Sequence, residues 1–148
     1  LGLDITRLYT EELLPVCSPA LLRGPHPLRQ PADLAHHTLL HMDHRQVWSI
    51  WLDAAGVTNV DLSRGPVFNQ ASIGIDAAVD GQGVALARTG LAAHDLITGR
   101  LVRPFELALP VSYAYWIVCP RATANLPKIT TFRDWLLAEA AEDTRQLA

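Results

Sequence analysis

The sequence lacks the features that would suit it to a membrane, to export or to nucleic acid. No run of apolar residues is long enough to span a bilayer, and the first residues lack the charged-then-apolar pattern of a signal peptide. The formal net charge is -3, whereas a domain that binds DNA by itself is usually basic. We therefore expect a cytoplasmic chain with no membrane partner and no DNA contact of its own. Because the chain does not begin with Met, we interpret Leu1 as a cut end.

Cysteine is scarce as well, because Cys17 and Cys119 are the only two. Each ends an apolar segment of strand character. Without a signal peptide, this placement indicates two reduced, buried thiols of an intracellular protein. A disulfide or a redox switch is the alternative.

Motifs of catalysis are missing. There is no Gly-x-Ser-x-Gly, and no Ser or Cys has an evident base partner. Residues 81–83 (Gly-Gln-Gly) lack the third glycine of a dinucleotide fingerprint and follow a helical pattern. Four histidines lie in one segment: His36, His37, His41 and His44. Their spacing matches no common zinc pattern. We therefore expect no enzyme activity, no cofactor and no metal, and we interpret the histidines as surface and loop residues, with His41 or His44 near a cleft.

What is present is an alternation of strand and helix patterns over 148 residues, a length that suits one domain. Strands are predicted at residues 8–16, 38–42, 67–69, 84–87, 101–103 and 113–119. Helices are predicted after the caps Ser18, Asp43 and Thr131, and at residues 71–80 and 91–98. The tryptophans at 48 and 51 recur at helical spacing and favour a core position. This alternation is typical of a largely parallel α/β sheet.

The order of residues 76–87, followed by residues 99–105, resembles the effector-binding domain of LysR-type transcriptional regulators. More narrowly, it is similar to the subfamily of glycine-cleavage and β-lactamase regulators. Further segments carry the resemblance: residues 13–19, 48–56, 115–120 and 132–136. The resemblance covers nearly the whole chain, in order.

The resemblance implies an α/β fold of the periplasmic-binding-protein-like (type 2) class. Residues 1–16 would be a crossing strand, residues 17–110 the second lobe, and residues 111–148 a return strand with a C-terminal helix. Part of the first lobe and the N-terminal winged helix-turn-helix would be missing, so DNA would be bound only through that missing domain. A homo-oligomer is implied too, with residues 73–80 at the dimer surface.

The resemblance also implies a small-molecule effector between the lobes. It places Met42, Asp43 and His44 on one cleft loop, and Asn69, Gln70, Ala71 and Ser72 on the other. The second group begins a helix directly after a strand, so its amide, hydroxyl and backbone N–H donors suit a polar or anionic effector. A plain helix cap is the equal alternative for Asn69. Tyr113 or Tyr115 would reach the cleft from the return strand, unless both serve in packing.

Two other classes of function stay open from the sequence alone. One is a stand-alone solute-binding protein of the same fold, which would need export. The other is a small α/β enzyme, for which the sequence offers no catalytic constellation. The residues upstream of Leu1 would distinguish them, because a regulator would have a winged helix-turn-helix there and a binding protein a signal peptide.

Overall fold

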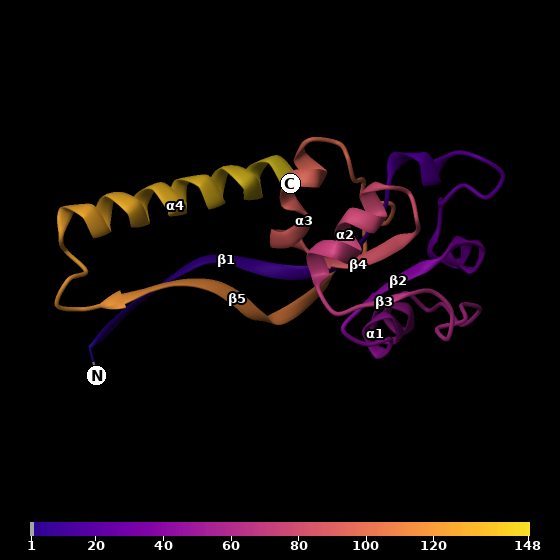
Figure 1. The fold of residues 1–148 in the computed structure, drawn as a ribbon, viewed down its shortest axis with the longest axis horizontal. Coiled ribbons are helices and arrows are strands. Elements are labelled where there is room, and N and C mark those ends of the chain that lie inside the picture. Colours follow the sequence, from indigo (N-terminus) through magenta and orange to yellow (C-terminus); the bar gives the residue numbers. More distant parts are fainter. Residues whose placement is uncertain (1) are drawn as a thin grey trace. The chain divides into compact units, whose positions relative to one another are not determined.

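The computed structural model describes residues 2–148 as two compact units. Unit 1 holds the residues up to Glu11 together with Val111–Ala148, and unit 2 is Glu12–Pro110. Two long strands belong partly to each unit, β1 (Leu3–Val16) and β5 (Leu109–Pro120). Both are visible in Figure 1 as neighbouring ribbons that run in opposite directions.

Unit 2 is built on a mixed sheet. Strand β2 (Leu39–Met42) lies between β3 (Val67–Phe68) and β4 (Val84–Arg88) and is parallel to both. The last residues of β1 pair antiparallel with β4. The strand order across the sheet is β3-β2-β4-β1-β5, so β3 is an edge strand. Because β2 and β3 are parallel neighbours, their carboxyl ends lie side by side, at what we call the carboxyl edge of the sheet.

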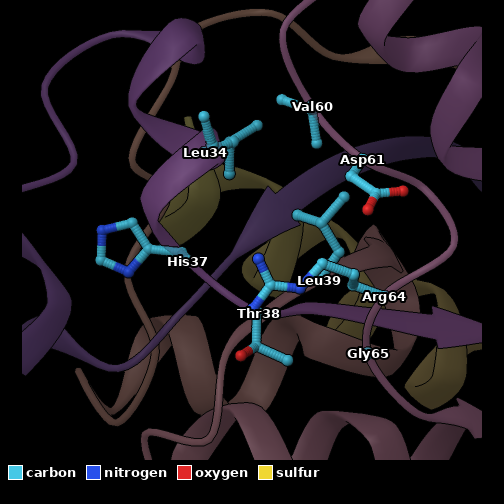
Figure 2. A pocket seen from close by; sticks show the side chains of 9 residues that line it. Leu34, His37, Thr38, Leu39, Val60, Asp61, Arg64 and Gly65 are labelled. Carbon is cyan, nitrogen blue, oxygen red and sulfur yellow. The ribbon is translucent and has the colours of Figure 1, made fainter.

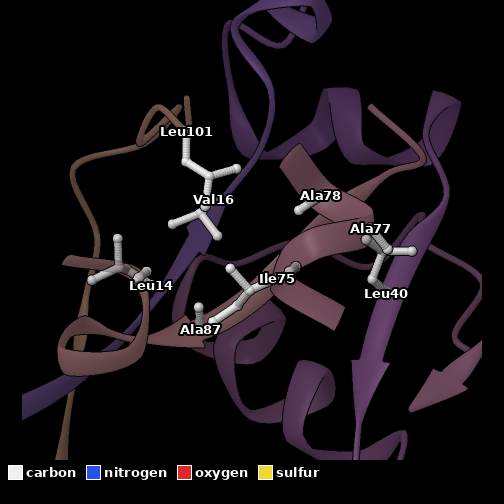
Figure 3. Close-up of a cluster of buried hydrophobic side chains, with 10 residues drawn as sticks. Leu14, Val16, Leu40, Ile75, Ala77, Ala78, Ala87 and Leu101 are labelled. Carbon is white, nitrogen blue, oxygen red and sulfur yellow. The ribbon is translucent and has the colours of Figure 1, made fainter. Parts of the chain in front are cut away.

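Helices cover both faces of this sheet: α1 (Gln46–Ala54), α2 (Ala71–Val79) and α3 (Thr89–Ile97). Because successive side chains of a strand point to opposite faces, β4 contributes Ala85 and Ala87 to one core cluster and Val84 and Leu86 to the other. Figure 3 shows the first cluster, in which Ile75 of α2 lies among the strand residues. A strand covered on both faces is apolar throughout, as residues 84–87 are.

The second cluster is centred on the two tryptophans of α1. Trp48 and Trp51 are 1% and 0% exposed, and their rings meet edge to face at 5.9 Å. Each indole N–H finds a backbone acceptor, Leu40 O at 3.1 Å and Leu107 O at 3.2 Å. The core role predicted for this pair is confirmed.

Unit 1 consists of the first half of β1, most of β5 and α4 (Pro127–Leu147). Tyr9 packs against Tyr115 at 5.2 Å, and the Arg7 guanidinium lies 4.8 Å above the Trp116 ring. The described residues of unit 1 that are buried are Glu11, Ala124 and Ala140. Many of its larger apolar side chains are exposed instead: Leu3, Ile5, Tyr113, Tyr115, Trp116, Val118, Leu126, Phe132 and Trp135. Unit 1 therefore has almost no core of its own.

The aromatic pair of α4, Phe132 and Trp135, is exposed. Phe132 and Trp135 stack on each other at 6.0 Å and are 59% and 55% exposed, whereas Ala140 is buried. We expect another chain or segment to cover this pair, because exposed apolar area of this kind commonly meets other protein. No helix within residues 2–148 combines the length and the apolar character that crossing a membrane requires.

Several element boundaries differ from the predicted ones. The last helix begins at Pro127, not after Thr131, because a proline at the first helical position needs no N–H partner. Strand β1 begins at Leu3 rather than at residue 8. The predicted strand at 101–103 shrinks to a bridge between Cys17 and Val102, because Pro104 cannot continue a ladder.

The cysteines also differ from the prediction in part. Both are free thiols, but only Cys17 is buried and Cys119 is half-buried. Burial raises the pKa of the Cys17 thiol to about 11. Because the thiolate is the reactive form, Cys17 is an inert core residue.

Candidate functional site

The two loops predicted to hold a ligand lie side by side at the carboxyl edge of the sheet in unit 2. The register pairs Met42 with Phe68, and the Asp43 N–H donates to the Phe68 carbonyl at 2.9 Å. We call the residues of these two loops the rim: Met42, Asp43, His44, Asn69, Gln70, Ala71 and Ser72. The structure thus brings the two rim loops together at the point where they leave the paired strands β2 and β3.

The first rim loop turns sharply at Asp43. Its backbone has a φ of 64°, which places it in the left-handed region, where Asp is among the better tolerated residues. The next residue, His44, donates its N–H back to the Met42 carbonyl at 2.7 Å. Asp43 therefore shapes the turn and does not cap α1, whose N-cap residue is Arg45. The side chains of Asp43 and His44 are exposed.

The second rim loop is the start of α2. The N-cap residue is Gln70 rather than Asn69, and no side chain caps this end. Asn69 lies one residue too early for the side-chain bond that an N-cap residue makes to the first turn. The first turn of α2 contains no acidic residue, although acidic residues commonly offset the positive end of a helix dipole there. The start of α2 is therefore suited to an anion.

Met42 behaves differently from its rim neighbours. Its side chain is half-buried and packs against the core beside Phe68. Both side chains lie against Gly74 of α2, where an added Cβ would come within 2.7 Å of the Met42 sulfur. Met42 thus contributes packing under the rim, and it is the rim's exposed polar residues that can meet a ligand.

His41 lies directly beneath the rim and is fully buried. Its Nε2 lies 2.9 Å from the Arg64 carbonyl, which assigns the ring proton to Nε2 because a carbonyl only accepts. Its Nδ1 is buried and has no partner among the described residues. Desolvation lowers the pKa of His41, and the nearby charge of Arg45 lowers it further against the opposing effect of the bond to Arg64. The ring is therefore neutral.

We expect the stability of unit 2 to fall in acid because of His41. Its pKa is lowered by folding, so its contribution is present above the ordinary histidine value of about 6.5 and is lost as the pH falls through the lowered value. The charged group that acts on the ring is the Arg45 guanidinium, and the Asp61 carboxylate interacts with the charges of Arg45 and Arg64. Urea unfolding of wild type and His41→Gln at pH 7.5 and 5.5 measures this. A loss of stability of the same size in both proteins would contradict the prediction.

The remaining histidines are distributed elsewhere. His26 and His36 stack at 4.4 Å, and a ring nitrogen of His37 lies 2.6 Å from the His26 carbonyl. Within residues 2–148, no three histidine, cysteine, aspartate or glutamate side chains are grouped so that they could hold a metal ion.

A small pocket of about 80 Å³ opens at the other end of β2, away from the rim. Figure 2 shows Asp61 on one side of it and His37 on the other, with the Arg64 side chain extending between them. Some of its polar groups are already paired, because Asp61 accepts hydrogen bonds from the N–H and the hydroxyl of Ser63. This pocket lies at the amino end of β2, whereas ligands of open α/β sheets bind at the carboxyl ends of the strands. The rim is therefore the better candidate.

The two tyrosines predicted to reach the site belong to unit 1. Tyr113 is 65% exposed and Tyr115 is 42% exposed, with the Tyr115 ring against Tyr9. Their contribution to a ligand site stays a prediction. Sequence reasoning missed Arg45, whose guanidinium binds three carbonyl groups behind the rim. An arginine before a helix is common, so no local pattern distinguishes it.

Comparison with known proteins gives consistent matches over most of the chain. The family model described as LysR substrate binding domain matches residues 1–141. The glycine cleavage system transcriptional activator of Escherichia coli K12 is 44% identical over 142 residues, which are 96% of this chain and 47% of that protein. The HTH-type transcriptional activator AmpR of Pseudomonas aeruginosa is 32% identical over 145 residues, which are 97% and 48% respectively. The chain thus spans about half the length of these relatives.

Solved structures agree with the sequence matches. The AmpR effector-binding domain from Citrobacter freundii superposes with a TM-score of 0.71 and 27% identity, over 95% of this chain and 68% of that chain. The effector domain of AmpR from Pseudomonas aeruginosa superposes with a TM-score of 0.69 and 32% identity, over 99% of this chain and 70% of that chain. These domains have the periplasmic-binding-protein-like type 2 fold, so the predicted fold class is confirmed.

Proposed function

Because the chain belongs to the family of LysR substrate-binding domains, we propose that it senses an effector for a transcriptional regulator. A small molecule binds at the rim, in a cleft between two lobes, and changes how the whole protein acts on DNA. A ligand can do this only if its affinity differs between two arrangements of the lobes. The observation that supports this proposal best is the meeting of the two rim loops at the carboxyl edge of the sheet.

The chemistry of the rim favours an effector with an anionic group, such as a carboxylate. The first turn of α2 offers backbone N–H groups without an acidic side chain to neutralise them. The exposed Gln70 and Ser72 add an amide and a hydroxyl next to these groups. Across the rim, the Asp43 carboxylate can accept a hydrogen bond from a donor on the same molecule. A small acid that also carries an N–H or O–H fits both loops.

Further parts of the proposal concern partners. DNA is bound through a separate domain of the full-length protein, because the chain carries a net charge of -3. The protein is a homo-oligomer, with residues 73–80 at the dimer surface, where Ile73 is 46% exposed. Tyr113 or Tyr115 contributes its hydroxyl to the effector site. Residues 1–16 are a crossing strand, residues 17–110 are the second lobe, and residues 111–148 are the return strand with the C-terminal helix.

Alanine at the rim tests the ligand site. In the full-length protein, we expect Gln70→Ala and Ser72→Ala each to raise the effector concentration for half-maximal response about tenfold, because a hydrogen bond to a charged group contributes about 1.5–3 kcal/mol. Operator affinity without effector should stay within twofold of wild type. A thermal-shift screen of carboxylic acids first identifies an effector, and promoter-reporter titrations then measure the response.

Gln82→Ala is the matched control, because Gln82 is exposed and lies just beyond the opposite end of α2. It should respond as wild type does. The rim assignment is wrong if Gln70→Ala and Ser72→Ala both respond like Gln82→Ala.

A further inference from the structure

The second rim loop is weakly held by the sheet itself. It follows β3, which has two residues and is the edge strand. Few backbone hydrogen bonds join the β3 segment to the β2 segment. Among them, the His41 N–H donates to the Pro66 carbonyl at 3.0 Å and the Asp43 N–H donates to the Phe68 carbonyl at 2.9 Å. So short an edge strand has little stability of its own. The loop that leads into β3 packs Val60 and Leu62 against the second core cluster, and side-chain hydrogen bonds connect it to the residues around β2.

Two side chains make that connection. The Arg45 guanidinium donates to the carbonyl oxygens of Leu62 at 3.1 Å, Arg64 at 2.9 Å and Gly65 at 2.8 Å. The His41 Nε2–H donates to the same Arg64 carbonyl at 2.9 Å. We call this set of hydrogen bonds, from His41 and Arg45 to residues 62–65, the latch. Charged donors in a fork geometry form strong bonds of this kind.

The latch joins the two rim loops through the residues next to them. His41 and Arg45 flank the first rim loop, residues 42–44, directly on either side. The carbonyl groups they hold precede β3 and the second rim loop. The position of the start of α2 relative to Asp43 therefore depends on the latch, although neither latch side chain belongs to the rim.

From this placement we propose that Arg45, assisted by His41, is a positioning residue for the effector site. The inference rests on the proposed function, because it assumes that the rim binds the effector. Arg45 fixes the distance between the two rim loops and so sets the affinity for an anion at the start of α2. Without it, the Leu62 and Gly65 carbonyl groups lose this donor, the Arg64 carbonyl keeps only His41, and β3 loosens from β2.

Hydrogen–deuterium exchange of the full-length protein tests the latch without any ligand. In Arg45→Gln we expect peptides covering residues 39–44 and 66–72 to exchange at least tenfold faster than in wild type. Peptides covering β4 should be unchanged, because the Val84 N–H pairs with Thr38 on the other side of β2. In Arg45→Lys, the exchange rates of residues 39–44 and 66–72 should lie between those of wild type and Arg45→Gln, since lysine keeps the charge but lacks the forked guanidinium.

Arg64→Gln is the matched control. It removes one positive charge from the same loop but leaves the backbone carbonyl that the latch uses, because Arg64 enters the latch only through that carbonyl. Its exchange should match wild type. Equal acceleration in Arg64→Gln and Arg45→Gln, no acceleration in Arg45→Gln, or acceleration spread evenly into β4 would each overturn the proposal.

A second arm uses acetate as the simplest carboxylate probe. In wild type, 50 mM sodium acetate (roughly a saturating excess for a weak anion site) should slow exchange at residues 69–74 relative to sodium chloride of equal ionic strength. Arg45→Gln should lose at least half of this protection, and Arg64→Gln should keep it. No acetate effect in wild type would contradict the proposed ligand class, while the exchange rates without acetate still decide whether the latch positions the rim. Full acetate protection in Arg45→Gln would overturn the positioning role.

Discussion

Replacing Trp51 with alanine is expected to lower the free energy of unfolding by about 3–5 kcal/mol. Trp51 is fully buried and its ring lies 5.7 Å from Phe105 and 5.9 Å from Trp48. Alanine would leave a cavity among these rings, and the Leu107 carbonyl would lose the indole donor that lies 3.2 Å away. Equilibrium urea unfolding, followed by circular dichroism, measures the change.

Trp135→Ala provides the comparison, because Trp135 is 55% exposed on α4. In the isolated chain its removal should change the unfolding free energy by less than about 1 kcal/mol. Similar losses for the two variants would show that α1 does not carry the core of unit 2. A large loss for Trp135→Ala alone would instead indicate that another surface covers α4.

The second large effect is expected at Gly65. Its φ is 89°, and an added Cβ would lie 2.1 Å from the Leu39 carbonyl oxygen. Gly65→Ala therefore combines left-handed strain with a backbone clash, and we expect a loss of about 2–5 kcal/mol of unfolding free energy. Because Gly65 also accepts a latch bond from Arg45, β3 should loosen from β2 as well. Urea unfolding measures the first effect, and hydrogen exchange at residues 66–72 measures the second.

Gly56→Ala separates the effect of left-handed backbone strain from the effect of the clash with Leu39. Gly56 has a φ of 70°, but its added Cβ would meet no atom within 4 Å. This variant carries the left-handed strain alone, which costs about 1–2 kcal/mol. If Gly65→Ala is no less stable than Gly56→Ala, the close approach of Gly65 to Leu39 does not exist in solution.

The two units differ in how far each accounts for its own stability. Unit 2 has helices on both faces of its sheet and two apolar clusters. Unit 1 exposes most of its large apolar side chains, and exposed apolar groups of this kind mark surfaces that meet other protein. This contrast agrees with a chain that spans about half of its curated relatives. Experiments on ligand response therefore belong to the full-length protein.

Local patterns in the sequence were enough to predict most of the elements. The apolar run at residues 84–87 predicts a strand buried on both faces, and the helical spacing of Trp48 and Trp51 predicts a core helix, because side-chain periodicity follows directly from backbone geometry. The pairing of the two rim loops was predictable as well. It follows from the family resemblance and from the rule that parallel strands end at the same edge.

Tertiary structure alone decided what lies behind the rim. Gln70 rather than Asn69 is the N-cap of α2, and Asp43 occupies a left-handed turn rather than a cap, because the pairing of β2 with β3 sets where each loop must turn. Arg45 and His41 find their acceptors 17 to 23 residues away. Contacts over such separations depend on how the sheet brings loops together, and no local periodicity encodes them. The sequence by itself therefore determined the family and most of the elements and predicted the rim, whereas the folded sheet decided which side chains bond to residues 62–65.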